Sequence, residues 1–208
     1  GTDLEVGIRH RVLGVKIEEP GAVILPTARI GSILRTTGDE ELMLETTDEH
    51  LTVKGLHASF KLPMEDPGLY PEVPDFGATS YHVISAGNLK KLIRRTVFAT
   101  DLDSARYALG GVLVELTAES LAMVGTDGRR LARMITTAEA ENDPPAPTGT
   151  PVIPVKALKL IERNLVDDDL LVHLTIQSGT AVLVRTESAV IYSRLVEGRF
   201  PRYQDVFP

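Results

Sequence analysis

Aspartates are the residues in this sequence with the clearest potential for catalytic chemistry. Asp3 and Asp127 each complete a Gly-Thr-Asp (GTD) triplet, and positions 167–169 hold three consecutive aspartates. Carboxylates that converge can bind a divalent metal ion and promote phosphoryl transfer. Structural roles are also available, because Asp-Gly at 127–128 is a common tight-turn pair and 167–169 follows a helical pattern as a solvated turn. A metal-dependent nuclease or phosphotransferase is therefore an alternative function, and it requires these aspartates to meet.

Other catalytic and cofactor-binding signals are missing from the sequence. The histidines at 10, 50, 57, 82 and 173 show no HxH or HExxH spacing that would favour a metal cluster. The chain has no cysteine, which excludes disulfides, thiolate zinc sites and cysteine nucleophiles. No Walker-type loop, GxGxxG or GxSxG motif occurs. We therefore expect no catalytic residue, no metal and no cofactor.

The GTD triplet belongs to a longer internal repeat. It recurs at Gly1 and Gly125, and two proline landmarks follow each copy in the same order, Pro26 with Pro154 and Pro71 with Pro201. A repeat of this length fits a duplicated domain rather than a solenoid unit. The second copy has a lead-in from position 81 that the first lacks, so we expect the chain to start inside its first domain.

Two kinds of hydrophobic pattern, alternation and helical spacing, predict the elements that must position these residues. Apolar and polar residues alternate from Glu41 and again from Leu171, which is typical of hairpin-linked antiparallel strands with one buried face. Helical spacing places one apolar stripe in each of three segments: Leu89, Leu92, Ile93 and Val97 after a Ser85 cap; Leu158, Ile161 and Leu165; and Ile30, Ile33 and Leu34. Helices alternating with hairpins predict an α+β fold. A proline-rich linker near position 70 divides it into domains at 1–76 and 77–208.

Basic residues gather on the predicted helices although the net charge is -7. The helix after Ser85 carries Lys90, Lys91, Arg94 and Arg95; the second carries Lys156, Lys159 and Arg163 on one face; the helix of the first domain carries Arg29 and Arg35. Such faces suit loose, sequence-independent contact with phosphates, while ordinary solvated helix faces are the other interpretation. No motif for reading bases is present. No stretch approaches the roughly 18 apolar residues of a membrane span.

Four blocks carry a family resemblance: "FATDLDSARYALGGVLVEL", "GTDGRRLA", "VIPVKALKLI" and "LVEGRFPRYQDVFP". They resemble the middle domain of the bacterial DNA polymerase sliding clamp, the beta subunit of DNA polymerase III, and the first 76 residues resemble the later part of its first domain. In that family, chains of three such domains close head to tail into a two-chain ring around duplex DNA. The resemblance implies duplicated clamp domains with antiparallel sheets outside and basic helices facing a central channel. It also implies a non-catalytic, cytoplasmic processivity factor for DNA replication.

The resemblance further implies a pocket for short linear motifs of DNA polymerase, the clamp loader and repair proteins. Carried over by motif, its wall is Arg106, Tyr107, Leu109, Thr126, Gly128, Arg130, Leu131, Pro201 and Val206. Its apolar members can bury a partner's leucine or phenylalanine while the arginines hold polar groups, although Leu131 and Val206 also suit a plain core. Departures from the family pattern stand at Ala108, Arg129 and Val155.

The third domain of the family has no counterpart in the sequence. By the resemblance it would complete the pocket and supply half of a dimer contact, whose other half lies near Phe60. We therefore expect a homodimeric ring for the full-length protein and a monomer for this fragment.

Overall fold

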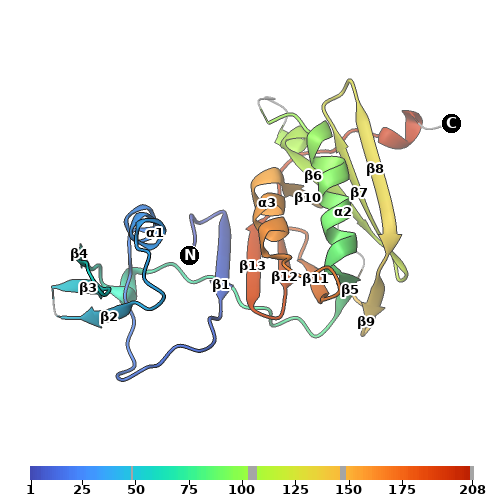
Figure 1. The fold of residues 1–208 in the computed structure, drawn as a ribbon. Coiled ribbons are helices and arrows are strands. Elements are labelled where there is room, and N and C mark those ends of the chain that lie inside the picture. The colour runs from blue at the N-terminus through green and yellow to red at the C-terminus, as the bar shows by residue number, and fades with distance from the viewer. Residues whose placement is uncertain (48, 103–106, 146–148, 207–208) are drawn as a thin grey trace. The chain divides into compact units, whose positions relative to one another are not determined.

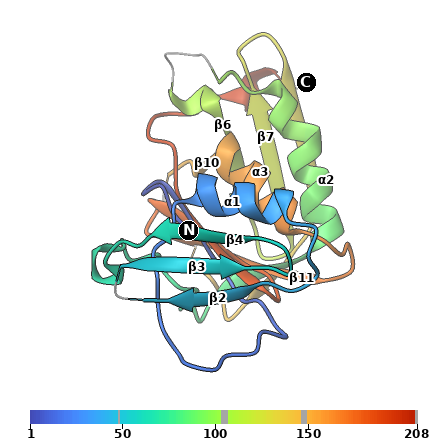
Figure 2. The ribbon, with the colours of Figure 1, turned by 60° about the vertical axis from the view of Figure 1, so that its left-hand side comes forward.

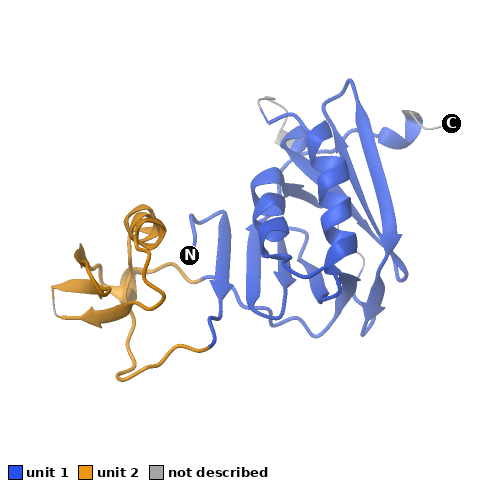
Figure 3. Cartoon of the chain, viewed as in Figure 1, with its two compact units in different colours: residues 1–13, 73–208 blue, residues 14–72 orange. Residues whose placement is uncertain are grey.

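The computed structural model describes residues 1–208 except 48, 103–106, 146–148 and 207–208. The chain divides into two compact units, which Figure 3 colours separately: residues 1–13 with 73–208, and residues 14–72. The division after residue 72 falls within the proline-rich stretch. Residues 1–13 group with the larger unit because their strand joins its sheet. The domain limits at 76 and 77 stay a prediction, since these units follow contacts rather than the repeat.

The larger unit contains two antiparallel sheets (Figure 1). The six-stranded sheet has the order β1 (Val6–His10), β13 (Ala189–Arg194), β12 (Ala181–Arg185), β11 (Leu171–Gln177), β5 (Tyr81–Ser85) and β9 (Glu139–Glu141). The four-stranded sheet has the order β10 (Val152–Pro154), β6 (Gly111–Leu116), β7 (Ser120–Thr126) and β8 (Leu131–Thr137). The predicted hairpins from Leu171 are β11 to β13, so this prediction is confirmed.

Two helices, α2 (Ala86–Thr96) and α3 (Val155–Asn164), lie next to each other over the sheets of the larger unit (Figures 1 and 2). The Ser85 hydroxyl caps α2 by accepting the amide of Asn88 at 3.3 Å. The predicted apolar stripes are buried, as Leu92 and Leu158 illustrate, except that Val97 follows the end of α2 and is partly buried. They pack into one core with residues of both sheets. Burying these stripes leaves the charged residues of each helix on its outer side.

The described residues also form four short 3₁₀ helices: η1 (Pro67–Leu69), η2 (Val97–Ala99), η3 (Tyr107–Gly110) and η4 (Tyr203–Val206). Among these residues, no helix is long and apolar enough to cross a membrane. The α+β fold with antiparallel sheets, predicted from the sequence, is confirmed.

The smaller unit packs one helix, α1 (Thr27–Thr36), against a three-stranded sheet of β2 (Met43–Thr46), β3 (His50–Lys54) and β4 (Ser59–Pro63). Its core is centred on Ile33 and Val53. The prediction that Leu34 shares the buried stripe is wrong, because its side chain is 57% exposed. A sheet of only three strands covers a narrow stripe of the helix, so Ile33 is the one buried residue of α1.

The first GTD triplet forms a tight turn that leads into β1. The Thr2 hydroxyl donates to the carbonyl oxygen of Val6 at 2.9 Å and accepts from the amide of Leu4 at 3.0 Å. One carboxylate oxygen of Asp3 accepts the amides of Glu5 and Val6 at 3.1 and 2.9 Å. Leu4 has a φ of 77°, in the left-handed region that bulky residues rarely adopt.

The second GTD triplet repeats the same hydrogen bonds between β7 and β8. The Thr126 hydroxyl donates to the carbonyl oxygen of Arg130 at 2.7 Å and accepts from the amide of Gly128 at 3.0 Å. Asp127 accepts the amides of Arg129 and Arg130, both at 2.9 Å. Gly128 takes the place of Leu4 with a φ of 86°. The two copies of the GTD triplet therefore form the same turn, with the same hydrogen bonds at equivalent positions.

Candidate functional sites

The exposed sides of α2 and α3 form a basic surface, here called the basic helix face. The predicted cations of the larger unit lie here: Lys91, Arg94, Arg95, Lys156, Lys159 and Arg163 are exposed, and Lys90 is largely covered, with its side chain 16% exposed. Between the two helices lies an open groove of about 430 Å³, lined by Arg94, Lys159, Glu162 and Arg163. Such a surface can attract polyanions through their phosphates without reading sequence. In the smaller unit, Arg29 and Arg35 are exposed on α1.

Three cations of the basic helix face are paired with carboxylates. Lys90 contacts Asp168 at 2.5 Å, and Arg94 contacts Glu162 at 2.5 Å. Lys156 contacts Asp3 in the first GTD turn. The hydrogen bond from Lys156 is the largest cause that lowers the pKa of Asp3 to about 2, followed by the amide of Val6. Lys91, Arg95, Lys159 and Arg163 form no ion pair within the part of the chain that the structure describes.

The predicted peptide pocket draws on three segments that converge on a small apolar cluster of the larger unit. Its buried members are Ala108, Leu113, Val124, Val152, Phe200 and Tyr203, with Leu131 and Val196 packed against them. The segments are η3, the start of β8 and the C-terminal stretch. Half-buried Leu131 thus packs against the cluster while part of its side chain faces solvent.

The remaining predicted pocket residues differ in accessibility. Leu109 and Thr126 are buried, and the Thr126 hydroxyl is engaged inside its own turn. Gly128, Arg130 and Pro201 are exposed. Arg106 lies outside the described residues. Tyr107 opens η3 and Val206 closes η4, and only their backbone is described.

Arg130 is held from two directions. Its Nε contacts Asp127 at 2.9 Å, and its guanidinium lies 5.9 Å from the centre of the Phe98 ring. An arginine over an aromatic face is attracted by the ring's quadrupole. Phe98 is 58% exposed, so this aromatic ring is available to a partner next to Arg130. The sequence prediction missed Phe98, although an apolar aromatic at the end of a basic helix was a usable signal.

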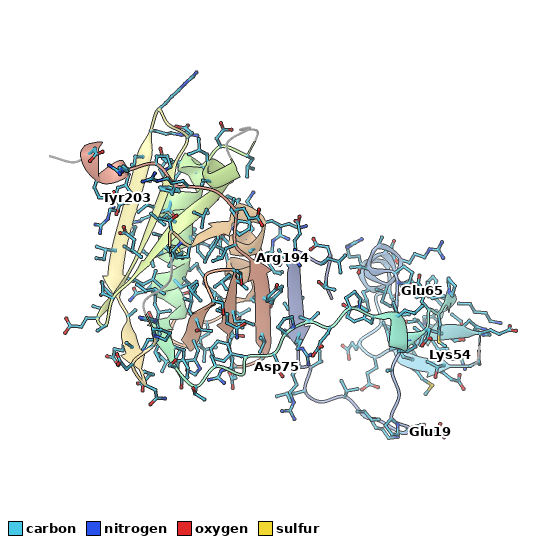
Figure 4. All side chains as sticks on the ribbon, turned by 180° about the vertical axis from the view of Figure 1, so that it is seen from behind. Glu19, Lys54, Glu65, Asp75, Arg194 and Tyr203 are labelled. Carbon is cyan, nitrogen blue, oxygen red and sulfur yellow. The ribbon has the colours of Figure 1, made fainter. Side chains whose placement is uncertain are left out.

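Tyr203 anchors the C-terminal segment that carries Pro201 (Figure 4). This tyrosine is buried, and its hydroxyl donates to Glu115 of β6 at 2.5 Å. Arg133 of β8 approaches the same carboxylate at 3.6 Å. Desolvation, and then the hydrogen bond to Glu115, raise the pKa of Tyr203. The sequence prediction missed this contact as well, because 88 residues separate its partners.

The aspartates do not assemble a metal site. Asp3 pairs with Lys156, Asp127 with Arg130 and Asp168 with Lys90. Within the described ranges, no group of three or more histidine, aspartate or glutamate side chains is placed to hold a metal ion. Nothing supports the metal-dependent nuclease or phosphotransferase.

Solved structures define the class of protein with this fold. The sliding clamp of Pseudomonas aeruginosa bound to griselimycin matches with a TM-score of 0.89 and 28% identity, over 100% of this chain and 56% of that chain. The Helicobacter pylori beta clamp bound to a DNA ligase peptide matches with a TM-score of 0.84 over 100% of this chain and 57% of that one. At 22% identity, this second likeness supports the fold alone.

Sequence relatives agree with this class. The beta sliding clamps of Chlamydia muridarum and Escherichia coli K12 are both 29% identical to this chain, over 99% and 100% of its length. The chain covers 55% and 56% of those relatives, so it spans about half of their length. Residues 83–202 match the family described as DNA polymerase III beta subunit, central domain. The chain belongs to this family, and the resemblance predicted from the sequence is confirmed.

Proposed function

We propose that this chain is part of a DNA sliding clamp, a non-catalytic processivity factor that encircles duplex DNA and tethers the replicative polymerase. The observation that carries the proposal is the basic helix face on a fold of the sliding-clamp class. Cations on neighbouring helices can contact backbone phosphates, which carry no sequence information, without selecting bases. A closed ring needs no tight site, because topological linkage replaces affinity and weak contacts permit sliding.

The proposed phosphate contacts are the cations of the three helices: Arg29, Arg35, Lys90, Lys91, Arg94, Arg95, Lys156, Lys159 and Arg163. In the ring, these helices face a central channel and the sheets lie outside. The domain limits of 1–76 and 77–208, a third domain, a homodimeric ring with a contact near Phe60, and a cytoplasmic location belong to the same proposal. So does a monomeric state of this chain by itself.

The second proposed activity is binding of short linear motifs from polymerases, the clamp loader and repair proteins. The convergence of η3, the start of β8 and the C-terminal stretch on one apolar cluster supports it. Leu131 offers apolar surface for a partner's leucine or phenylalanine. Arg130, whose Nε is paired with Asp127, offers the N–H donors of its two terminal nitrogens for the partner's polar groups. The Pseudomonas aeruginosa sliding clamp bound to griselimycin, at 28% identity, accords with this proposal.

The ring is tested with the longer protein that carries the third domain. It is loaded on nicked circular DNA and passed through a sizing column before and after the circle is linearised. We expect co-elution with the circle and loss from the linear form. Equal retention on both forms, abolished only by salt, contradicts the ring and leaves an ordinary phosphate-binding surface.

A further inference from the structure

The groove between α2 and α3 contains one negative charge among its cations. Arg94, Lys159 and Arg163 supply three positive side chains, and Glu162 is the only carboxylate among its lining residues. Glu162 Oε1 contacts Arg94 Nε at 2.5 Å. The Glu162 side chain is 25% exposed and that of Arg94 is 65% exposed, so the carboxylate lies deeper than the guanidinium that it holds.

This carboxylate occupies a place that suits a phosphate oxygen. Carboxylate and phosphate both bind guanidinium groups through charge-assisted hydrogen bonds, so they compete for the same donors. The other two acids paired with the basic helix face differ from Glu162 in location. Asp168 follows α3 and Asp3 lies in the first GTD turn, and neither lines the groove.

We propose that Glu162 weakens the hold of this surface on nucleic acid by competing with backbone phosphates for Arg94. The inference rests on the proposed DNA contact of the basic helix face and adds a residue that sets its strength. Because Glu162 competes for Arg94, each phosphate contact of this arginine is short-lived, which suits a protein that must move along DNA. Lys159 and Arg163 attract the polyanion, and Arg94 binds a phosphate only after its ion pair with Glu162 breaks.

The test measures binding of a fluorescent duplex of about 20 base pairs by the chain and by its Glu162→Gln variant, over a range of salt concentrations. One additional phosphate contact makes the plot of log K against log salt steeper by about 0.9. The affinity advantage of the variant should therefore shrink by about threefold between about 50 and about 200 mM salt. Thermal unfolding of both proteins confirms that the fold is intact.

Two further variants locate the effect. Glu119→Gln removes the same charge from an exposed residue in the turn between β6 and β7, away from the groove lining, and should leave the slope unchanged. Arg94→Gln combined with Glu162→Gln should lose the advantage, because the released cation is gone. A second readout follows the Arg94 Nε–Hε NMR signal of the wild type, which should shift when duplex is added.

The outcomes separate this inference from the proposed function. Equal affinity and slope for wild type and Glu162→Gln overturn the inference, while binding by both leaves the DNA contact standing. Weaker binding by the variant also overturns it, because Glu162 would then orient Arg94 for phosphate instead of competing. If neither protein binds duplex at the lowest salt, both the inference and the proposed DNA contact fail.

Discussion

Replacing Gly128 by alanine tests whether the second GTD turn depends on its left-handed residue. A Cβ atom at this position would meet no heavy atom within 4 Å, so the substitution changes backbone preference without a clash. The φ of 86° costs an L-residue about 1 to 2 kcal/mol, while alanine restricts the unfolded chain by about 0.4 to 1 kcal/mol. We expect a net loss of about 1 kcal/mol in the free energy of unfolding of the larger unit.

The assay is urea unfolding followed by circular dichroism, with two matched controls. Gly77→Ala also adds a Cβ into open space, but at a residue whose φ is not in the left-handed region. This control should be neutral or stabilise by up to about 1 kcal/mol. Gly128→Asn should lose less than Gly128→Ala, because asparagine tolerates this conformation better. An unchanged free energy of unfolding for Gly128→Ala would refute the reasoning.

Three other expectations concern the larger unit. Tyr203→Phe removes the hydroxyl bound to Glu115 and should lower the free energy of unfolding, measured by thermal unfolding, by about 1 to 2 kcal/mol. In the double variant with Glu115→Gln, the second substitution should cost less than it does alone. Additive losses would exclude direct coupling of the two side chains. Burial is the largest cause that lowers the pKa of His82 and of His173, so as the pH falls the unfolded state binds protons before the folded state does. The free energy of unfolding from urea titrations should therefore be highest above about pH 6.5 and decrease below it. A constant free energy of unfolding down to about pH 5 would contradict this. Leu131→Ala should weaken binding of a leucine- and phenylalanine-containing peptide in calorimetry by several fold or more, whereas Leu171→Ala, at an exposed leucine outside the predicted pocket, should not.

Local patterns accounted for what was predicted correctly about the helices. The Ser85 cap and the spacing of Leu89, Leu92 and Ile93 describe interactions within one segment, which sequence spacing encodes directly. The prediction that Leu34 is buried was wrong, because its burial depends on the width of the sheet that faces α1. The spacing of apolar residues carries no information about that width.

The cations of the candidate site were predictable from the sequence, and the carboxylates paired with them were not. The positions of Arg94 and Lys156 on helix faces followed from helical period. Their partners Glu162 and Asp3 lie 68 and 153 residues away and were not predicted. Pairs so distant in sequence form only after the elements have packed. The sequence therefore indicated a uniformly basic face, whereas the structure has one in which several charges are already neutralised.

The matched GTD turns have a consequence for how copies of this fold join. The strand that follows the first turn, β1, lies at one end of the six-stranded sheet and pairs with β13, the strand of that sheet that comes last along the chain. The strand that follows the second turn, β8, lies at the end of its sheet and pairs only with β7 among the described residues. Because the two turns are equivalent, β8 corresponds to β1. The free edge of β8 is therefore where a strand equivalent to β13, from another copy of the fold, can pair. Such head-to-tail joining has no built-in stop, so the curvature per copy decides between a closed circle and an open filament.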